Sequence, residues 1–319
     1  MRAQLRKHPH KQRGVALITA VLIVALVTAA AVAMASKQQF DIRRTANIFN
    51  NDIAYQFALG AEDYARNVLE WDITKARSPN DHLGEDWAQD VAVPVEGTML
   101  TGSVQDLHGR INLNSLLDAN GKPNVEMVKR FKHLLDLLGL NQDISQAVLD
   151  WIDVDINPSF NGGAEDDYYM LQTPPYRAAN SLMVSVSELL LVMGIDDETF
   201  QLLLPHVSAL PNINSNINVN TATAEVLASL AVTMTIADGE ALIQARPATG
   251  FAKIADFTGQ TLLTNHPTFK NDFLDIKSEY FLVDAMAEFD ESTAQLHSLV
   301  HRNNNTGGVR VVMRSRGAY

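Results

Sequence analysis

The 319-residue chain contains no cysteine, which excludes disulfide bridges, thiolate zinc sites, iron–sulfur clusters and a cysteine nucleophile. Hydrophobic residues make up 46% of it, so a disordered chain is excluded as well. With 17 glycines and 11 prolines, it is neither collagen-like nor low in complexity. The length is sufficient for one large domain or two ordinary ones with a buried core.

Positive charge is scarce outside the amino terminus. Residues 1–36 contain five basic side chains and no acid, so the remaining chain holds 20 basic and 37 acidic residues, a balance of −17. Contacts with phosphates require Lys and Arg, so this acidic body disfavours nucleic acid as a partner.

Common catalytic motifs are missing too. The chain has no Gly-x-Ser-x-Gly, His-Glu-x-x-His or phosphate-binding loop, and its nine histidines are dispersed. Acidic pairs exist through abundance alone, and nothing singles out a glycosidase-like couple. We therefore predict that the chain is not an enzyme.

An uncharged apolar segment occupies residues 15–35. At about 1.5 Å per residue it spans roughly 31 Å, the thickness of a bilayer core. Because basic residues precede it, the positive-inside rule predicts a cytoplasmic amino terminus and a body beyond the membrane. Apolar residues then recur every three or four positions, which predicts one helix from about Val15 to Trp71.

Three interpretations fit this amino terminus. Ala31-Val32-Ala33 matches a signal-peptidase site, which would suit a periplasmic hydrolase, but the apolar run exceeds the usual length of about 7–15 residues. A plain membrane anchor is the second interpretation. The third rests on Gln12-Arg13-Gly14 directly before an apolar helix, which resembles a type IV prepilin leader. That resemblance implies that a prepilin peptidase cuts between Gly14 and Val15 and methylates the amine of Val15.

Residue 19, the fifth after that cut, is a threonine. Most pilins have a glutamate at this position, which pairs with the amino-terminal amine of a neighbouring subunit. A subunit without this carboxylate need not dock beneath a preceding subunit. Thr19 therefore suits the first subunit, at the tip of a fibre.

Acidic residues are densest between positions 150 and 167, on both sides of a loop that contains Pro158, Gly162 and Gly163. Oxygen ligands without His or Cys favour calcium, which tolerates irregular geometry. The spacing is not that of an EF-hand. From the residues alone, a solvated acidic loop and a calcium site are both compatible with this pattern.

This acidic region and Pro174-Pro175-Tyr176-Arg177-Ala178-Ala179-Asn180, together with the leader and Thr19, resemble the K-type minor pseudopilins of type II secretion systems. The resemblance covers essentially the whole chain. It implies a single-pass inner-membrane protein with a periplasmic body, whose partners are the I-type and J-type minor pseudopilins and other pseudopilus subunits. It also implies calcium in a helical domain, with the expected ligands Asp153, Asp155, Glu165, Asp166 and Asp167.

An internal repeat suggests a different class of function. The segment from Gly109 to Leu117 is echoed by that from Ser215 to Leu227, which resembles the opening of helix-hairpin-helix modules of DNA-binding or competence proteins. Residues 212–245 contain no Lys or Arg for phosphate contacts. We therefore predict that the asparagines of the repeat tie turns.

Strand-like segments at both ends of a helix-rich middle predict an α+β fold. A long amino-terminal helix would pack on an antiparallel, pilin-like sheet that a large helical domain interrupts. Pro94 predicts that the first strand is an edge strand. The predicted parts are a leader (1–14), a membrane segment (15–36), a first pilin-like part (37–111), an inserted helical domain (112–276) and carboxy-terminal strands (277–319).

Overall fold

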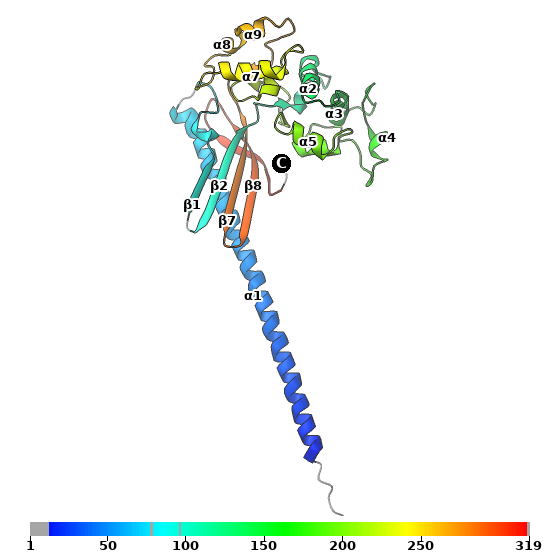
Figure 1. Cartoon of the computed structure of the whole chain (residues 1–319), viewed down its shortest axis with the longest axis vertical. Coiled ribbons are helices and arrows are strands. Elements are labelled where there is room, and N and C mark those ends of the chain that lie inside the picture. Colours follow the sequence, from blue (N-terminus) through cyan, green and yellow to red (C-terminus); the bar gives the residue numbers. More distant parts are fainter. Residues whose placement is uncertain (1–12, 77–78, 96, 318–319) are drawn as a thin grey trace, which may run out of the picture.

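The computed structural model describes residues 13–76, 79–95 and 97–317; most of the predicted leader, residues 1–12, lies outside the described residues. Helix α1 (Arg13–Trp71) is 59 residues long, and its apolar half projects away from the body with its side chains exposed (Figure 1). No proline interrupts it, and a π-helical turn, η1 (Asp72–Ala76), ends it. The predicted long helix is confirmed.

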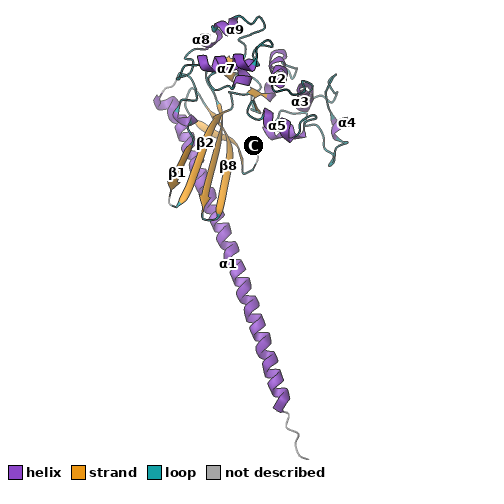
Figure 2. Cartoon of the chain, in the orientation of Figure 1, coloured by secondary structure: helices purple, strands orange, loops and turns teal. Residues whose placement is uncertain are grey.

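The body contains a five-stranded antiparallel sheet in the order β1-β2-β7-β8-β9 (Figure 2). Its strands are β1 (Val91–Val95), β2 (Thr98–Asp106), β7 (Tyr280–Phe289), β8 (Ser292–Arg302) and β9 (Val309–Ser315). Strand β1 lies at one edge, as Pro94 predicts, because a proline cannot donate a hydrogen bond to a second neighbour. The last three strands form an antiparallel meander.

The second half of α1 covers one face of this sheet. Ala54 and Ala58 pack against Ala285 and Leu296, and these small residues let the helix approach the strands closely. The fully buried Glu62 lies within this contact, where Arg314 donates to it at 2.7 and 2.8 Å and the Ser298 hydroxyl also donates to it.

Strands β2 and β7 pair directly, although more than 170 residues separate them along the chain. The intervening chain forms short elements: η3 (Leu113–Leu116), α2 (Val125–Leu137), α3 (Ile144–Ile152), α4 (Asp166–Tyr169), η4 (Val186–Leu191), α5 (Asp197–Leu203), α6 (Ala224–Ala228), α7 (Ile236–Ala245), α8 (Ile254–Thr258) and α9 (Thr261–Thr264). Two-residue strands pair in parallel, β3 (Ile111–Asn112) with β4 (Val207–Ser208) and β5 (Ile217–Asn218) with β6 (Leu274–Asp275). One further short helix, η2 (Asp86–Ala88), precedes β1.

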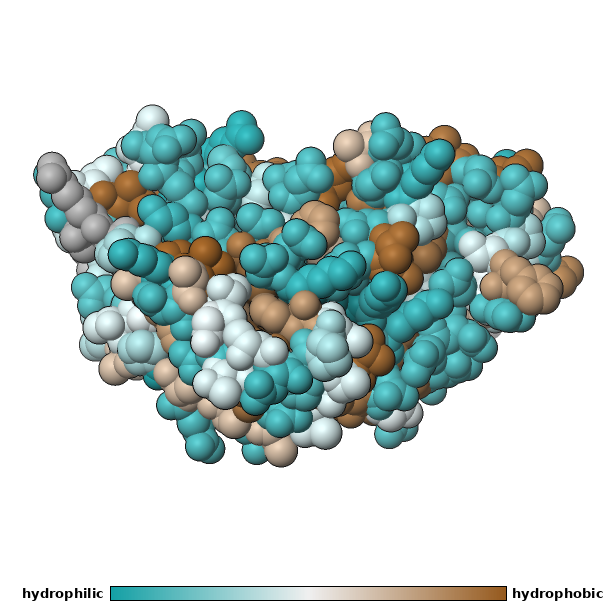
Figure 3. Space-filling view, turned by 90° about the horizontal axis from the view of Figure 1, so that it is seen from above, coloured by the Kyte–Doolittle hydropathy of each residue, from teal (hydrophilic) through white to brown (hydrophobic). Residues whose placement is uncertain are grey.

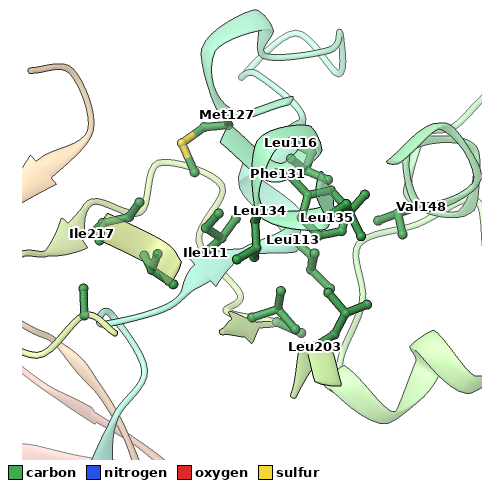
Figure 4. Packing of buried hydrophobic residues seen from close by; sticks show 14 of the residues in the cluster. Ile111, Leu113, Leu116, Met127, Phe131, Leu134, Leu135, Val148, Leu203 and Ile217 are labelled. Atoms are coloured by element: carbon green, nitrogen blue, oxygen red, sulfur yellow. The ribbon is translucent and has the colours of Figure 1, made fainter. Parts of the chain in front are cut away.

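These helices share a core of their own. Leu113, Phe131, Leu134 and Leu203 meet in its centre (Figure 4), and every buried member of this cluster falls between Ile111 and Ile276. A segment that buries its own apolar side chains is what an inserted domain requires, although the predicted boundaries themselves stay a prediction. It lies at the end of the body opposite the apolar half of α1 (Figure 1).

The asparagine repeat has a structural role in both copies. The side chains of Asn112 and Asn218 accept hydrogen bonds from the backbone two residues ahead, at 3.2 and 2.9 Å. Asn114 bonds the backbone of Met183 in both directions, and Asn220 bonds Phe251 in the same way. The asparagines tie turns, as predicted, and they also join distant segments of the chain.

Candidate functional site

Three of the predicted calcium ligands meet at the carboxyl end of α3. The helix ends at Ile152, because Asp153 adopts an extended backbone after its N–H bonds the carbonyl of Leu149 at 2.9 Å. The following loop returns the chain, so that Asp153, Asp155 and Glu165 each present an oxygen within 4.8 Å of the other two. This part of the helical region lies far from α1 in Figure 1, near α4.

Half of the six carboxylate oxygens of this cluster are buried without a donor among the described residues. Asp153 Oδ1 and both oxygens of Glu165 accept no hydrogen bond from any described residue. No Lys, Arg or His of the described chain forms an ion pair with the three acids. Asp155 accepts hydrogen bonds from the N–H and the side-chain amide of Asn157, at 2.8 and 3.0 Å. Such unpaired buried charge costs several kcal/mol unless a proton or a cation neutralises it.

The electrostatics of the cluster point the same way. Burial, followed by the charges of Asp155 and Asp150, raises the pKa of Asp153 to about 6. Burial, followed by Asp150 and Asp153, raises the pKa of Glu165 to about 7. The environment therefore disfavours the ionised form of both side chains unless a positive charge binds beside them.

Asp150 is bonded to the loop that follows α3. It is fully buried at the last turn of α3, and the N–H of Ser159 donates to its Oδ2 at 2.8 Å. A Cβ on Gly163 would collide with Asp150 and with the backbone of Ser159, so only glycine fits there. Asp150 Oδ1 has no donor among the described residues, and burial raises its pKa.

The other two predicted ligands lie outside this group. Asp166 accepts a hydrogen bond from the N–H of Ala178 at 3.1 Å and pairs with Arg177 at 3.7 Å. Asp167 is exposed and has no oxygen in the cluster. The structure therefore brings together three of the five predicted ligands and adds Asp150 beside them. The sequence feature that could have identified Asp150 is its position about one helical turn before Asp153.

The predicted cleavage position lies at the start of α1. Gly14 and Val15 are exposed in the first turn, and a Cβ on Gly14 would meet no atom within 4 Å. The hydroxyl of Thr19 donates to the carbonyls of Val15 and Ala16 at 3.1 and 3.0 Å, so it is satisfied inside its own helix. A threonine bonded in this way is compatible with lipid.

A second acidic cluster was not predicted. Asp72, Asp81 and Glu85 also bring oxygens within 4.8 Å of one another, where η1, the following loop and the end of β8 meet. Here Arg302 supplies the positive charge: it bonds Asp72 at 2.7 Å and also bonds Asp81. The sequence feature that could have indicated this cluster is the alternation of β8. It places Arg302 on the same inward face as Val300, two residues earlier.

Comparison with known proteins agrees with this architecture. The family described as "Type II secretion system (T2SS), protein K" matches residues 109–212 and 217–277. Type II secretion system protein K of Pseudomonas aeruginosa is 37% identical, in an alignment that covers 96% of this chain and 93% of that protein. The chain belongs to the type II secretion system protein K family.

Protein K of Pectobacterium carotovorum is 35% identical over 97% of this chain and 98% of that one. Among solved structures, the chain is similar to one in the GspK–GspI–GspJ complex of enterotoxigenic Escherichia coli, with a TM-score of 0.76 and 25% identity over 86% of this chain and 100% of that one. The carboxylate cluster and Asp150 lie within the first region that the protein K family matches.

Membership of the protein K family confirms the predicted pilin-like α+β fold and the role of a minor pseudopilin in type II secretion. The DNA-binding and periplasmic-hydrolase alternatives are not favoured. One helix of the described chain, Gly14–Lys75, is long and apolar enough to cross a membrane, which suggests a single-pass anchor.

Proposed function

We propose that this chain is the tip subunit of the pseudopilus, where it forms a complex with an I-type and a J-type minor pseudopilin to initiate or cap the fibre for protein export. One observation supports this above all: the GspK-type structure that it resembles was solved together with GspI and GspJ.

Two features support a position at the tip. Thr19 provides no carboxylate for docking beneath a preceding subunit, and its hydroxyl bonds within its own helix. The face that lies farthest from the apolar half of α1 is predominantly hydrophilic, with apolar residues in separate spots (Figure 3). Such a surface suits an end that faces solvent rather than another subunit.

We further propose that the anchor lies in the inner membrane, with the leader in the cytoplasm and the body in the periplasm. The five basic residues before position 15 support this orientation. Prepilin peptidase would cut after Gly14 and methylate Val15. Because Gly14 has open space around it, a Gly14→Leu substitution should preserve the helix but leave the leader attached, as intact mass spectrometry would detect.

Asp153, Asp155 and Glu165 are the residues that we propose to hold a calcium ion, with Asp150 positioning the loop. The support is the set of buried oxygens without donors, which are hard ligands in an irregular arrangement. A bound calcium ion would offset two of the three negative charges that the ionised cluster carries. Zinc is a poorer match, because the group contains no His or Cys.

We also infer that the chain acts as a structural subunit and has no enzymatic activity of its own. Its family is a component of the secretion apparatus, and that membership is what supports this inference.

The test of the proposed function is assembly. The full chain, expressed with the I-type and J-type pseudopilins of the same system and extracted in detergent, should retain both on affinity purification. Labelled protein should occur at one end of each isolated fibre. Retention of neither partner, or labelling along the whole fibre, would contradict the proposal. Thr19→Glu should assemble normally or slightly less well, because the tip position does not require this carboxylate.

A further inference from the structure

The loop that joins Asp155 to Glu165 contains an Asn-Gly pair at positions 161 and 162. Asn161 is exposed and adopts a positive φ of 62°, and its neighbour Phe160 is 90% exposed. Asparagine is one of the few side chains that accept this left-handed conformation. The pair therefore lies at a turn that projects into solvent, where water reaches the side-chain amide.

An asparagine before a glycine can lose its side-chain amide without an enzyme. The backbone nitrogen of the glycine gives its proton to hydroxide and attacks Cγ of the asparagine. A nitrogen–Cγ bond forms, the Cγ–Nδ2 bond breaks, and the amide nitrogen leaves as ammonia with a proton from water. A further water molecule opens the succinimide ring at either carbonyl, which yields aspartate or isoaspartate. Glycine favours the attack because no Cβ shields its nitrogen.

The attacking nitrogen is free at this pair and held at another. Neither the N–H of Gly162 nor the side-chain amide of Asn161 bonds any described residue. At the second Asn-Gly pair of the chain, which is also exposed, the N–H of Gly121 donates to the carbonyl of Asp118 at 2.9 Å. The loss of such a hydrogen bond before the attack slows the reaction about tenfold, so Asn120 should react more slowly.

Contacts within the loop restrain the first pair in a different way. The N–H of Ser159 donates to Asp150 at 2.8 Å, and the N–H of Gly163 donates to the carbonyl of Ser159 at 3.2 Å. Gly162 lies against Asp143, since a Cβ on this glycine would be 2.5 Å from the Cβ of that residue. Formation of the ring requires the peptide before Gly162 to rotate, which needs a loop released from these contacts.

We propose that Asn161 is a site of spontaneous deamidation and that a calcium ion at Asp155 and Glu165 protects it. The protection rests on the proposed calcium site, whereas the assignment of Asn161 does not. These two ligands lie on either side of the loop and offer oxygens within 4.8 Å of each other, so an ion between them would fasten both ends. If only the opened loop reacts, calcium at about 100 times its dissociation constant should slow the reaction about 100-fold.

Isoaspartate, one of the two products, should impair the calcium site. It routes the main chain through the former side chain and so lengthens the loop by one carbon atom. The contact of Gly162 with Asp143 leaves little room for the extra atom, and Glu165 would shift relative to Asp155. Calcium would then bind more weakly, so a chain kept without calcium loses its response to calcium.

The two Asn-Gly pairs allow a test within one molecule. The full chain in detergent would be incubated at pH 8, either in chelator or in millimolar calcium, and then digested for mass spectrometry. In chelator we expect deamidation at Asn161 to be about tenfold faster than at Asn120. In calcium, deamidation at Asn161 should be about 100-fold slower than in chelator.

Three variants complete the test. Asn161→Gln should not react at this position, because a glutamine would have to close a larger ring that forms more slowly. Asn120→Gln is the matched control and should leave the rate at Asn161 unchanged. Asp153→Ala removes a proposed calcium ligand, so its rate in calcium should equal its rate in chelator. Melting temperatures would confirm that the variants are folded.

The outcomes separate this proposal from the calcium site. Equal rates at Asn161 and Asn120 in chelator would overturn the assignment of Asn161. Equal rates at Asn161 with and without calcium, together with a melting temperature that rises in calcium, would overturn the protection while the calcium site stands. A melting temperature that does not respond to calcium would refute the calcium site and the protection with it. The rates in chelator would then still decide whether Asn161 is the reactive residue.

Discussion

Two clusters of three carboxylates differ in how the protein neutralises them. Asp72, Asp81 and Glu85 lie where the body and the end of α1 meet, and the fully buried Arg302 pairs with two of them. Asp153, Asp155 and Glu165 lie in the helical region with no basic partner among the described residues. The chain thus provides its own cation at the first cluster, and only the second is a candidate for a metal. Acidic density alone does not distinguish the two.

Removal of the built-in cation should have the largest effect. Arg302→Met would leave Asp72 and Asp81 buried without a counter-charge, so we expect a loss of about 3–5 kcal/mol in the free energy of unfolding. Burial, followed by Glu85, already raises the pKa of Asp72 to about 7. Since an uncompensated acid is tolerated only when protonated, the loss should be greater at pH 8 than at pH 5.

Denaturant unfolding at both pH values would measure this effect, with Arg310→Met as the control, because Arg310 is an exposed residue of β9. A variant at position 302 that is as stable as the control would show that the first cluster does not need its arginine.

Addition of calcium should have the next largest effect, and only through the second cluster. At about 100 times its dissociation constant, calcium should stabilise the chain by about 2.7 kcal/mol. Asp153→Ala should remove most of this gain, whereas Glu198→Ala, an exposed acid of α5 outside the cluster, should keep it. Magnesium should substitute poorly, because it prefers small octahedral sites. An equal melting temperature in chelator and in millimolar calcium would contradict the calcium site, and the acidic residues would then form a solvated loop.

The pH dependence of calcium binding sharpens the contrast further. Protons compete with the metal at Asp153 and Glu165, whose pKa values are raised to about 6 and about 7. Calcium affinity should therefore be roughly tenfold lower at pH 6 than at pH 7.5. In chelator, stability should fall as pH rises from about 4 to 7, because the folded state keeps protons that the unfolded state has lost. Calorimetric titration at the two pH values would test the first expectation.

The smallest effects should come from the two acids that the cluster leaves out. Asp167→Ala should leave the calcium-dependent gain in melting temperature unchanged, because this side chain is exposed and apart. Asp166→Ala removes a hydrogen bond to Ala178 and a surface pair with Arg177, which should cost about 1 kcal/mol or less. If either variant abolished the response to calcium, the ligand set would be wider than three residues.

The candidate site shows where prediction from sequence stops. The density of acids between positions 150 and 167 indicates a cation site, because close carboxylates repel one another. Its membership depends on the path of the loop, which brings Glu165 to Asp153 and turns Asp167 to solvent. The cluster around Arg302 unites residues 72, 81, 85 and 302, and no local pattern connects positions so far apart.

The sequence by itself determined the long helix and the edge position of β1, whereas the leader junction, which rests on a short motif, stays a prediction. Each of these follows from local periodicity, from a single proline or from a short motif, so neighbouring residues are sufficient to specify it. Only the tertiary structure decided which acids lie together and why Asn112 and Asn218 are buried. These features depend on packing between distant segments, where burial removes water and leaves each polar group to the partners that the fold supplies.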